Sequence, residues 1–439
     1  MQRRVAGHGS SIVFDSSRRR RPSGSETNRC HKEDRPIHEW YRFVLSFPPH
    51  LVRSYLDRFQ VDHRNFVLDP FCGTGTTLVE CKKLGIPSVG IEANPVAHLA
   101  TQVKTSWDVN AKSLLVHAQE VVRLARQMMD RKKFRIPTLT SSQQTLLIRN
   151  SISPVPLRKA LILRSAIDHL RDSRFSQYEQ LALAKQAVSS FSNLHFGPEV
   201  GVSRKKTIDA PVFDLWLDQL QHMASDLDHI QLNGDAPAKV YLGDARNISK
   251  TLAPNSIDTV ITSPPYPNEK DYSRTTRLES VLLGLLTDKM DLRRQKKTFL
   301  RSNTRNVYKG DDDARWIRNN TRVTQLADRI ENRRIELGKT SGFERQYHRV
   351  VRLYFGGMAR HLRELAPKLK TGARLAYVVG DQASYFRILI RTGEILGEIA
   401  EEIGYVVDRI DLFRTRLSTV SKNQLREEVM ILRWPGTAC

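Results

Sequence analysis

The chain reads DPFCGTGTT at residues 69–77, directly after the short apolar run 65–68. Gly73 and Gly75 lack a Cβ atom, so the backbone can turn sharply there and approach a ligand closely. A helical pattern begins at residue 76 and is closed by Gly85. The free N–H groups at the start of this helix can bind an anionic group such as a carboxylate. The stretch therefore predicts a strand, a ligand-binding turn and a helix in succession.

Two common glycine motifs are excluded at this turn. The dinucleotide fingerprint requires a third glycine at position 78, where the chain has Leu78. The phosphate-binding loop requires Gly-Lys followed by Ser or Thr, and the turn has no lysine. We therefore expect the turn to bind a nucleoside-like ligand without gripping a phosphate.

The alternation of strands and helices continues beyond the turn. Residues 88–92 form an apolar run that ends in Glu92, and residues 94–104 follow with a helical period. Together with the first strand and helix they predict a βαβ unit of Rossmann type. Further strands are expected at 239–244, 257–262 and 373–379, and the runs at 405–414 and 428–434 predict a closing hairpin.

A second motif, TSPPY at residues 262–266, follows directly after an apolar strand. Pro264 and Pro265 have no N–H group and hold the backbone extended, so their carbonyls are rigid hydrogen-bond acceptors. Ser263 adds a hydroxyl that can accept a hydrogen bond, and Tyr266 offers a ring face for stacking. This set suits a planar ligand that carries an amino group. Taken alone, the motif would be an ordinary Pro-Pro turn.

In this order the two motifs resemble those of the amino-group DNA methyltransferases, which modify N4 of cytosine or N6 of adenine. In that family the first motif is Asp-Pro-Phe-x-Gly-x-Gly-Thr-Thr, and the second is Asp, Asn or Ser followed by Pro-Pro and an aromatic residue. The chain matches both at every specified position, and the resemblance covers about residues 36–107 and 238–434. It implies an α/β, Rossmann-like class I methyltransferase fold. Such a fold has a mostly parallel seven-stranded sheet, a closing antiparallel hairpin and, here, helical insertions.

The resemblance also implies S-adenosyl-L-methionine as the cofactor and assigns residues to it. Glu92 would accept both ribose hydroxyls, or else be a surface acid that caps a helix. Asp244 would contact the adenine ring, or else be a turn residue. An aromatic segment at 41–49 lies where the family places another cofactor motif, although aromatic residues are more often core. The methionine part would be held by Asp69, Pro70, Phe71, Gly73 and Gly75, with its carboxylate at Thr76 and Thr77.

The catalytic residues implied by the resemblance are Ser263, Pro264, Pro265 and Tyr266. Ser263 and the Pro264 carbonyl would hold the amine hydrogens, while Tyr266 would stack on a base taken out of the DNA helix. Methylation of a ring carbon would need a Pro-Cys nucleophile, and none of the four cysteines follows a proline. Serine at the first position resembles the N4-cytosine subgroup more than the N6-adenine subgroup, so we favour cytosine.

Three other functions compete with this interpretation. An RNA base methyltransferase uses similar motifs, but the chain shows no clear N-terminal RNA-binding domain. A catalytically inactive nucleic-acid-binding relative would show decay of one motif, and both motifs are intact. A nucleotide-dependent oxidoreductase would need the missing third glycine and would leave Ser-Pro-Pro-Tyr unexplained.

Charge and composition point to the partner and the compartment. The formal net charge is +23 and the pI is about 10.0, which favours a polyanionic partner and fits DNA. The four cysteines form no CxxC pair, so we expect neither a metal site nor a disulfide scaffold. No apolar run approaches the length of a membrane span, and we place the protein in the cytoplasm. A restriction or defence system is one context for such an enzyme.

Changes in pattern divide the chain. Residues 1–35 are expected to be a disordered basic arm, and 36–107 the first part of a methyltransferase domain. Residues 108–236 predict a helical insertion, a candidate for target recognition, with a loop at 191–206. Residues 237–439 form the second part, interrupted at about 285–340 by a strongly basic insertion. That basic insertion is either a DNA contact or a solvated, partly disordered loop.

Overall fold

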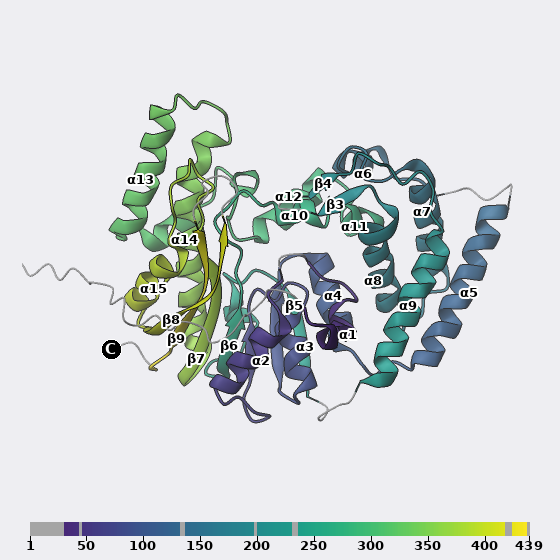
Figure 1. Cartoon of the computed structure of the whole chain (residues 1–439), viewed down its shortest axis with the longest axis horizontal. Helices are drawn as coiled ribbons and strands as arrows, with labels where there is room; N and C mark the ends of the chain where they lie inside the picture. Colours follow the sequence, from purple (N-terminus) through teal and green to yellow (C-terminus); the bar gives the residue numbers. More distant parts are fainter. Residues whose placement is uncertain are drawn as a thin grey trace, which may run out of the picture.

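The computed structural model describes residues 30–43, 46–131, 137–196, 200–230, 236–417 and 424–436. Its centre is a seven-stranded sheet in the order β5-β2-β1-β6-β7-β9-β8 (Figure 1). Strands β5, β2, β1, β6 and β7 are parallel, and β9 lies antiparallel between β7 and β8. This is the predicted class I arrangement with its closing hairpin. The strands are β1 (Val67–Asp69), β2 (Ser88–Glu92), β5 (Ala238–Leu242), β6 (Ile257–Thr262), β7 (Leu369–Gly380), β8 (Val406–Leu417) and β9 (Gln424–Arg433).

Helices cover both faces of the sheet because the side chains of each strand alternate between the faces. In β7, Leu375, Tyr377 and Val379 pack with the helices α13 (Thr321–Glu336), α14 (Tyr347–Leu365) and α15 (Thr392–Ile403). Ala376 and Val378 of the same strand belong to a core with α2 (Pro49–Arg58) and Cys81 of α3 (Thr76–Lys83). The central strand β7 is therefore buried between two helical layers.

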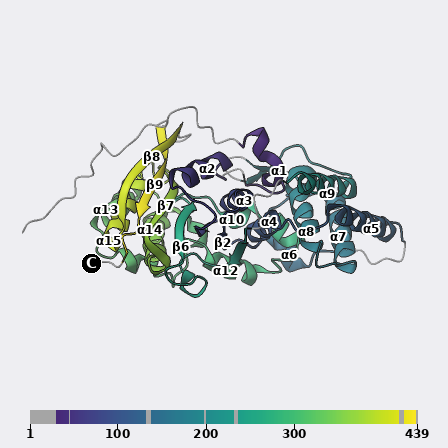
Figure 2. The same cartoon turned by 90° about the horizontal axis from the view of Figure 1, so that it is seen from below.

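A helical lobe stands beside the sheet and contains most of the predicted insertion (Figures 1 and 2). Its core continues into α4 (Pro95–Thr105), which contributes Val96, Leu99 and Val103. The lobe is therefore packed onto the cofactor half of the sheet. Its elements are α5 (Ala111–Asp130), α6 (Ser141–Leu146), α7 (Pro154–His169), α8 (Ser176–Gln186), α9 (Val212–His229) and the hairpin β3 (Leu194–Phe196) and β4 (Val200–Val202).

Before the first strand, α1 covers only Arg35–His38, and Pro49 begins α2 because its fixed φ suits the first helical turn. Two local predictions need correction. The loop expected at 191–206 contains the hairpin β3–β4. Within the basic insertion lie α12 (Lys289–Thr298), the short turns Thr304–Asn306 and Asp313–Ile317, and α13, so it is not a solvated loop.

The structure leaves one predicted segment undescribed and adds two short helices. Most of the expected N-terminal arm, residues 1–29, lies outside the described residues. The short helices α10 (Tyr272–Thr275) and α11 (Arg277–Leu282) follow the catalytic motif and were not expected. In the described part of the chain, no helix has the length and apolar character needed to cross a membrane.

Candidate active site

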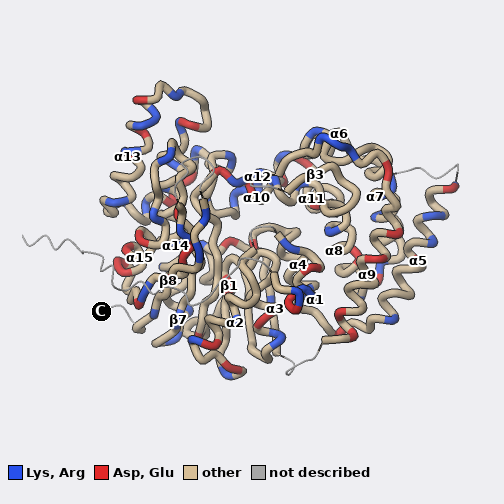
Figure 3. The backbone as a smooth tube through the Cα atoms, in the orientation of Figure 1, with Lys and Arg blue, Asp and Glu red and all other residues tan. Residues whose placement is uncertain are grey.

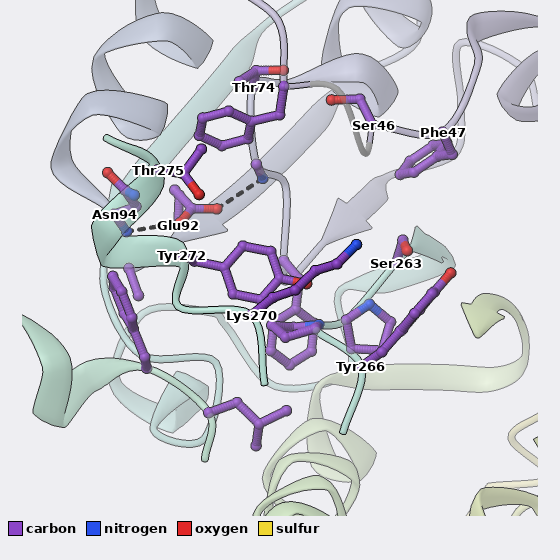
Figure 4. Close-up of a pocket in the computed structure, with 18 of the residues that line it drawn as sticks. Ser46, Phe47, Thr74, Glu92, Asn94, Ser263, Tyr266, Lys270, Tyr272 and Thr275 are labelled. Carbon is purple, nitrogen blue, oxygen red and sulfur yellow. Dashed lines mark hydrogen bonds between the residues drawn. The ribbon is translucent and has the colours of Figure 1, made fainter. Parts of the chain in front are cut away.

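A cavity of about 750 Å³ opens at the carboxyl ends of the parallel strands. Ligands of open α/β sheets bind at this edge, and the volume is that of an ordinary ligand pocket. Both motifs line the cavity, although almost two hundred residues separate them in the sequence (Figure 4). The predicted site residues in its wall are Pro70, Phe71, Gly73, Thr76, Glu92, Asp244, Ser263, Pro264, Pro265 and Tyr266.

Glu92 lies at the end of β2 and is fixed by the turn beside it. Its Oε2 accepts a hydrogen bond from the Gly73 N–H at 2.8 Å, and its Oε1 accepts one from the Asn94 N–H at 2.7 Å (Figure 4). Burial raises the pKa of Glu92 to about 7, against the lowering effect of these two hydrogen bonds. The carboxyl group is thus held at the cavity wall and titrates near neutral pH.

The two glycines of the turn serve different purposes. Gly73 has φ +53°, a conformation that favours glycine, and a Cβ there would meet nothing within 4 Å. The cavity is therefore open in front of Gly73. Gly75 has φ +83°, and a Cβ there would lie 2.8 Å from Thr101 Cγ2, so packing against α4 requires this glycine. Between them, Thr74 lines the cavity, and its buried Oγ1 has no hydrogen-bond partner among the described residues. Such an atom is suited to a ligand.

Asp69 is not part of the cavity wall. It is fully buried, and burial raises its pKa to about 6. Its carboxylate accepts hydrogen bonds from the Thr77 hydroxyl at 2.7 Å and from the Thr262 hydroxyl at 2.6 Å. Gly75 and Thr77 likewise lie outside the cavity wall, so the cofactor contacts expected of these three residues stay predictions. Since Thr262 immediately precedes Ser263, Asp69 ties the glycine turn to the catalytic motif.

The catalytic motif begins where β6 ends, beside β7. The Ser263 hydroxyl donates to the Val378 carbonyl at 3.1 Å, which leaves the lone pairs of its oxygen as acceptors. Tyr266 hydrogen-bonds with Ser263, and burial raises the pKa of its phenol. Its ring packs on Gly380, where a Cβ would lie 2.9 Å from Tyr266 Cε2. The motif is therefore oriented by the end of β7.

Asp244 follows β5 and lines the cavity, but its carboxylate is already paired. Arg246 Nε and Nη2 donate to both Asp244 oxygens at 2.7–3.1 Å, and the ion pair is almost completely buried. Arg246 also binds Asp313 and the Lys297 carbonyl of the basic insertion. Arg246 thus fixes the position from which the Asp244 carboxylate can contact a ligand.

Comparisons with known proteins agree on one family. Residues 8–102 match the N6/N4 methyltransferase family model, described as a DNA methylase. The chain is 26% identical over 427 residues to the Type II methyltransferase M.BsoBI of Geobacillus stearothermophilus, which covers 89% of this chain and 82% of the relative. It is 26% identical over 440 residues to M.AvaI of Anabaena variabilis, with 92% and 87% covered. The chain is therefore similar in sequence to amino-group DNA methyltransferases.

A solved structure matches this chain more weakly. The rRNA methyltransferase aviRa of Streptomyces viridochromogenes aligns with a TM-score of 0.32 and 11% identity, over 92% of this chain and 94% of the other. The fold of the chain is defined by its own strand order.

Sequence reasoning missed two buried cations near the cavity. Lys104, 1% exposed, donates to the carbonyls of Thr74 at 2.6 Å and Tyr41 at 3.3 Å, and so joins the glycine turn to the aromatic segment. Burial lowers the pKa of Lys104 to about 7. Arg246 is the second. In the sequence neither differs from a surface cation, since a lysine at a helix end is common. The aromatic segment itself was anticipated, and Tyr41, Phe43, Ser46 and Phe47 line the cavity.

Proposed function

We propose that this protein is an S-adenosylmethionine-dependent DNA methyltransferase that modifies an exocyclic amino group, favouring N4 of cytosine. The observation that carries the proposal is a single cavity lined by Glu92 and the glycine turn at one end and by Ser263–Tyr266 at the other. A methyl donor and an amine acceptor must meet in one site, and proximity and alignment then supply much of the rate.

The cofactor end has the chemistry that S-adenosylmethionine requires. The Glu92 carboxylate suits ribose hydroxyls, and the unpaired Thr74 Oγ1 suits a polar group of the methionine part. Asp244, held by Arg246, suits the adenine ring. When bound, the cofactor supplies a methyl group on a sulfonium, which is a strong electrophile. These residues bind and orient it, and the chain needs no nucleophile of its own.

The catalytic end has acceptors where an amine would need them. An exocyclic base nitrogen is a weak nucleophile because its lone pair is delocalised into the ring. The Ser263 oxygen, whose proton is donated to Val378, and the Pro264 carbonyl accept the amine hydrogens. This favours localisation of the lone pair on nitrogen. Tyr266 offers its ring for stacking on the flipped base.

The charge of the chain supports DNA as the substrate. Lysine and arginine positions are spread along the backbone and occur repeatedly in α12 (Figure 3). Cations in the cavity wall include Arg274, Arg305, Arg414 and Arg416. Phosphate contacts of this kind position a duplex on the protein. Because M.BsoBI and M.AvaI are Type II methyltransferases, we place the protein in a restriction-modification system, with an endonuclease that cuts the same unmethylated site.

Nucleoside analysis tests the proposal directly. The protein is expressed in a methylation-free bacterial host, and the DNA is digested and analysed by mass spectrometry. We expect N4-methylcytosine from the wild type and none from Ser263→Ala or Tyr266→Ala. N6-methyladenine instead would keep the enzyme class and reverse the base assignment. Cofactor binding without any methylated DNA base would contradict a DNA methyltransferase and redirect the search to RNA.

A further inference from the structure

The basic insertion has an inner face of buried polar side chains. Residues 301–304 read RSNT and are all buried, as are Lys296 and Asn306. Buried polar groups are costly unless they are hydrogen-bonded, so such a run has a structural purpose. Arg301 organises it from within, donating to the Phe299 carbonyl and to both oxygens of Asp311.

Three contacts join this inner face to the catalytic loop, which we define as residues 267–271. The Thr304 hydroxyl donates to Glu269 Oε2 at 2.7 Å. Asn303 Nδ2 donates to the Lys270 carbonyl at 2.9 Å. Lys296 Nζ donates to Asp271 Oδ2 at 2.8 Å, and both side chains are nearly buried, at 11% and 5% exposure. Every residue from 269 to 271 is thus held by the insertion.

The Lys296–Asp271 pair lies at the centre of these contacts. The other oxygen of Asp271 caps α10 by accepting from the Ser273 N–H and hydroxyl, at 3.1 and 2.7 Å. Lys296 also donates to the Arg305 carbonyl at 3.2 Å. Removing one partner of a buried ion pair leaves the other charge without compensation. The loop would then be free to move away from the cavity, where Lys270 and Tyr272 form part of the wall (Figure 4).

The same insertion holds the cofactor end of the cavity. Through Arg246, Asp313 and the Lys297 carbonyl fix Asp244. The outer face of the insertion is cationic, with Arg293 and Arg294 exposed, whereas the exposed Arg305 also lines the cavity. Gln295 lies between the faces, and its buried amide atoms have no partner in the described part of the chain. The basic insertion therefore presents exposed arginines to solvent, where they could contact phosphate. On its other side it hydrogen-bonds to the loop that borders the cavity.

We propose that the basic insertion is a positioning element, whose Lys296, Asn303 and Thr304 hold the catalytic loop in place for methyl transfer while its outer arginines contact DNA. This inference rests on the proposed function. It assigns no chemical step to the insertion. Its residues act through the loop and through Asp244, so docking of DNA on the outer face is coupled to the geometry of both ends of the site.

Two lysines that are neighbours in α12 allow a matched test. Lys296→Met removes the buried ammonium, whereas Lys297→Met makes the same change on an exposed side chain and leaves the Lys297 backbone carbonyl, which accepts from Arg246, in place. Single-turnover methyl transfer is measured with radiolabelled S-adenosylmethionine and unmethylated plasmid DNA. We expect at least a tenfold lower rate for Lys296→Met, with cofactor and DNA affinities within about twofold of wild type, because small misplacements of a reacting group cost one to two orders of magnitude. Lys297→Met should transfer methyl at the wild-type rate.

Two additional variants guard against a folding defect. Thr304→Val removes the hydroxyl bond to Glu269 Oε2 but keeps the backbone N–H bond to Oε1, and it should lower the rate severalfold. Lys296→Arg should restore part of the activity. Equal rates for Lys296→Met and Lys297→Met would overturn the proposal. Hydrogen exchange of residues 266–272 in the free protein is independent of turnover. It should be faster in Lys296→Met than in Lys297→Met, and unchanged exchange would contradict the inference even if wild type methylates no DNA.

Discussion

At the scale of single residues, Glu92 connects the cofactor site to pH. Burial raises its pKa to about 7, although backbone N–H groups of Asn94 and Gly73 stabilise the charged form. Ribose hydroxyls donate hydrogen bonds, so they need the ionised carboxylate as an acceptor. As the pH falls through about 7, the fraction of protonated Glu92 increases. The protonated carboxyl group is a weaker acceptor of hydrogen bonds from the ribose hydroxyls.

We therefore predict that the dissociation constant for S-adenosylmethionine is lowest above pH 7 and rises as the pH falls to 6 and below. For one proton the increase approaches tenfold per pH unit well below the pKa. Isothermal titration calorimetry between pH 5.5 and 8.5 measures it. Glu92→Gln should bind about tenfold or more weakly at pH 8 and lose this component of the pH profile. If the variant keeps the wild-type profile, another group is responsible.

The sequence predicted residues whose motif defines their chemistry, and was less informative where only packing defines it. Ser263 and Glu92 were expected at the site and line the cavity. Asp69 belongs to the same motif but is turned inward to Thr77 and Thr262, because the strand end needs a buried acceptor there. A motif records which residues are needed, and does not distinguish a ligand contact from a support of the turn.

At the scale of elements, the end of β7 shapes the catalytic motif. Gly380 is the last residue of this strand, and the Tyr266 ring occupies the space where a side chain at 380 would lie. A methyl group there would approach Tyr266 Cε2 to 2.9 Å, closer than packed carbon atoms allow. The ring would have to rotate or shift away from Ser263.

We predict that Gly380→Ala lowers the single-turnover rate of methyl transfer by about tenfold or more while the affinity for S-adenosylmethionine is unchanged. Fluorescence of 2-aminopurine placed at the target base would report weaker retention of the flipped base. Gly342→Ala is the matched control, since a Cβ there meets nothing within 4 Å. The role given to Tyr266 would be contradicted by a Gly380→Ala enzyme that is as fast as this control.

Strands were predictable where a short, mostly apolar run precedes a turn or a motif. The strands at 257–262 and 88–92 were placed at their observed bounds, and nearly all of their residues are buried. The basic insertion was ambiguous because its buried contacts are polar, as in Lys296 with Asp271. Hydrophobic periodicity carries no signal for such packing. The hairpin β3–β4 has strands of only three residues, too short to show an alternation.

At the scale of the whole molecule, the helical lobe shares one core with α4, the helix that packs on the cofactor half of the sheet. Val96, Leu99 and Val103 of α4 pack with residues of α5, α7, α8 and α9, while α4 also contacts β2 and β5. Asp226 of α9 adds polar ties, accepting from Trp40 Nε1 at 2.7 Å and from the Ile37 N–H at 2.9 Å. An insertion that is continuous with its host in this way has no boundary at which to unfold separately.

Trp216 tests this continuity, because it lies at the centre of the lobe, far along the chain from the motifs. It is fully buried in α9, and its Nε1 donates to the Glu179 carbonyl at 2.9 Å. Trp216→Ala should lower the free energy of unfolding by about 3–5 kcal/mol, the usual cost of such a cavity. Calorimetry should show a single unfolding transition, and added S-adenosylmethionine should raise the midpoint temperature of that whole transition.

The control is Ile208→Ala, at a side chain that is 76% exposed, which should change the free energy of unfolding by less than about 0.5 kcal/mol. Two separate transitions, with the cofactor shifting only one, would mean that the lobe is an independent domain and that contacts through α4 do not couple it to the site.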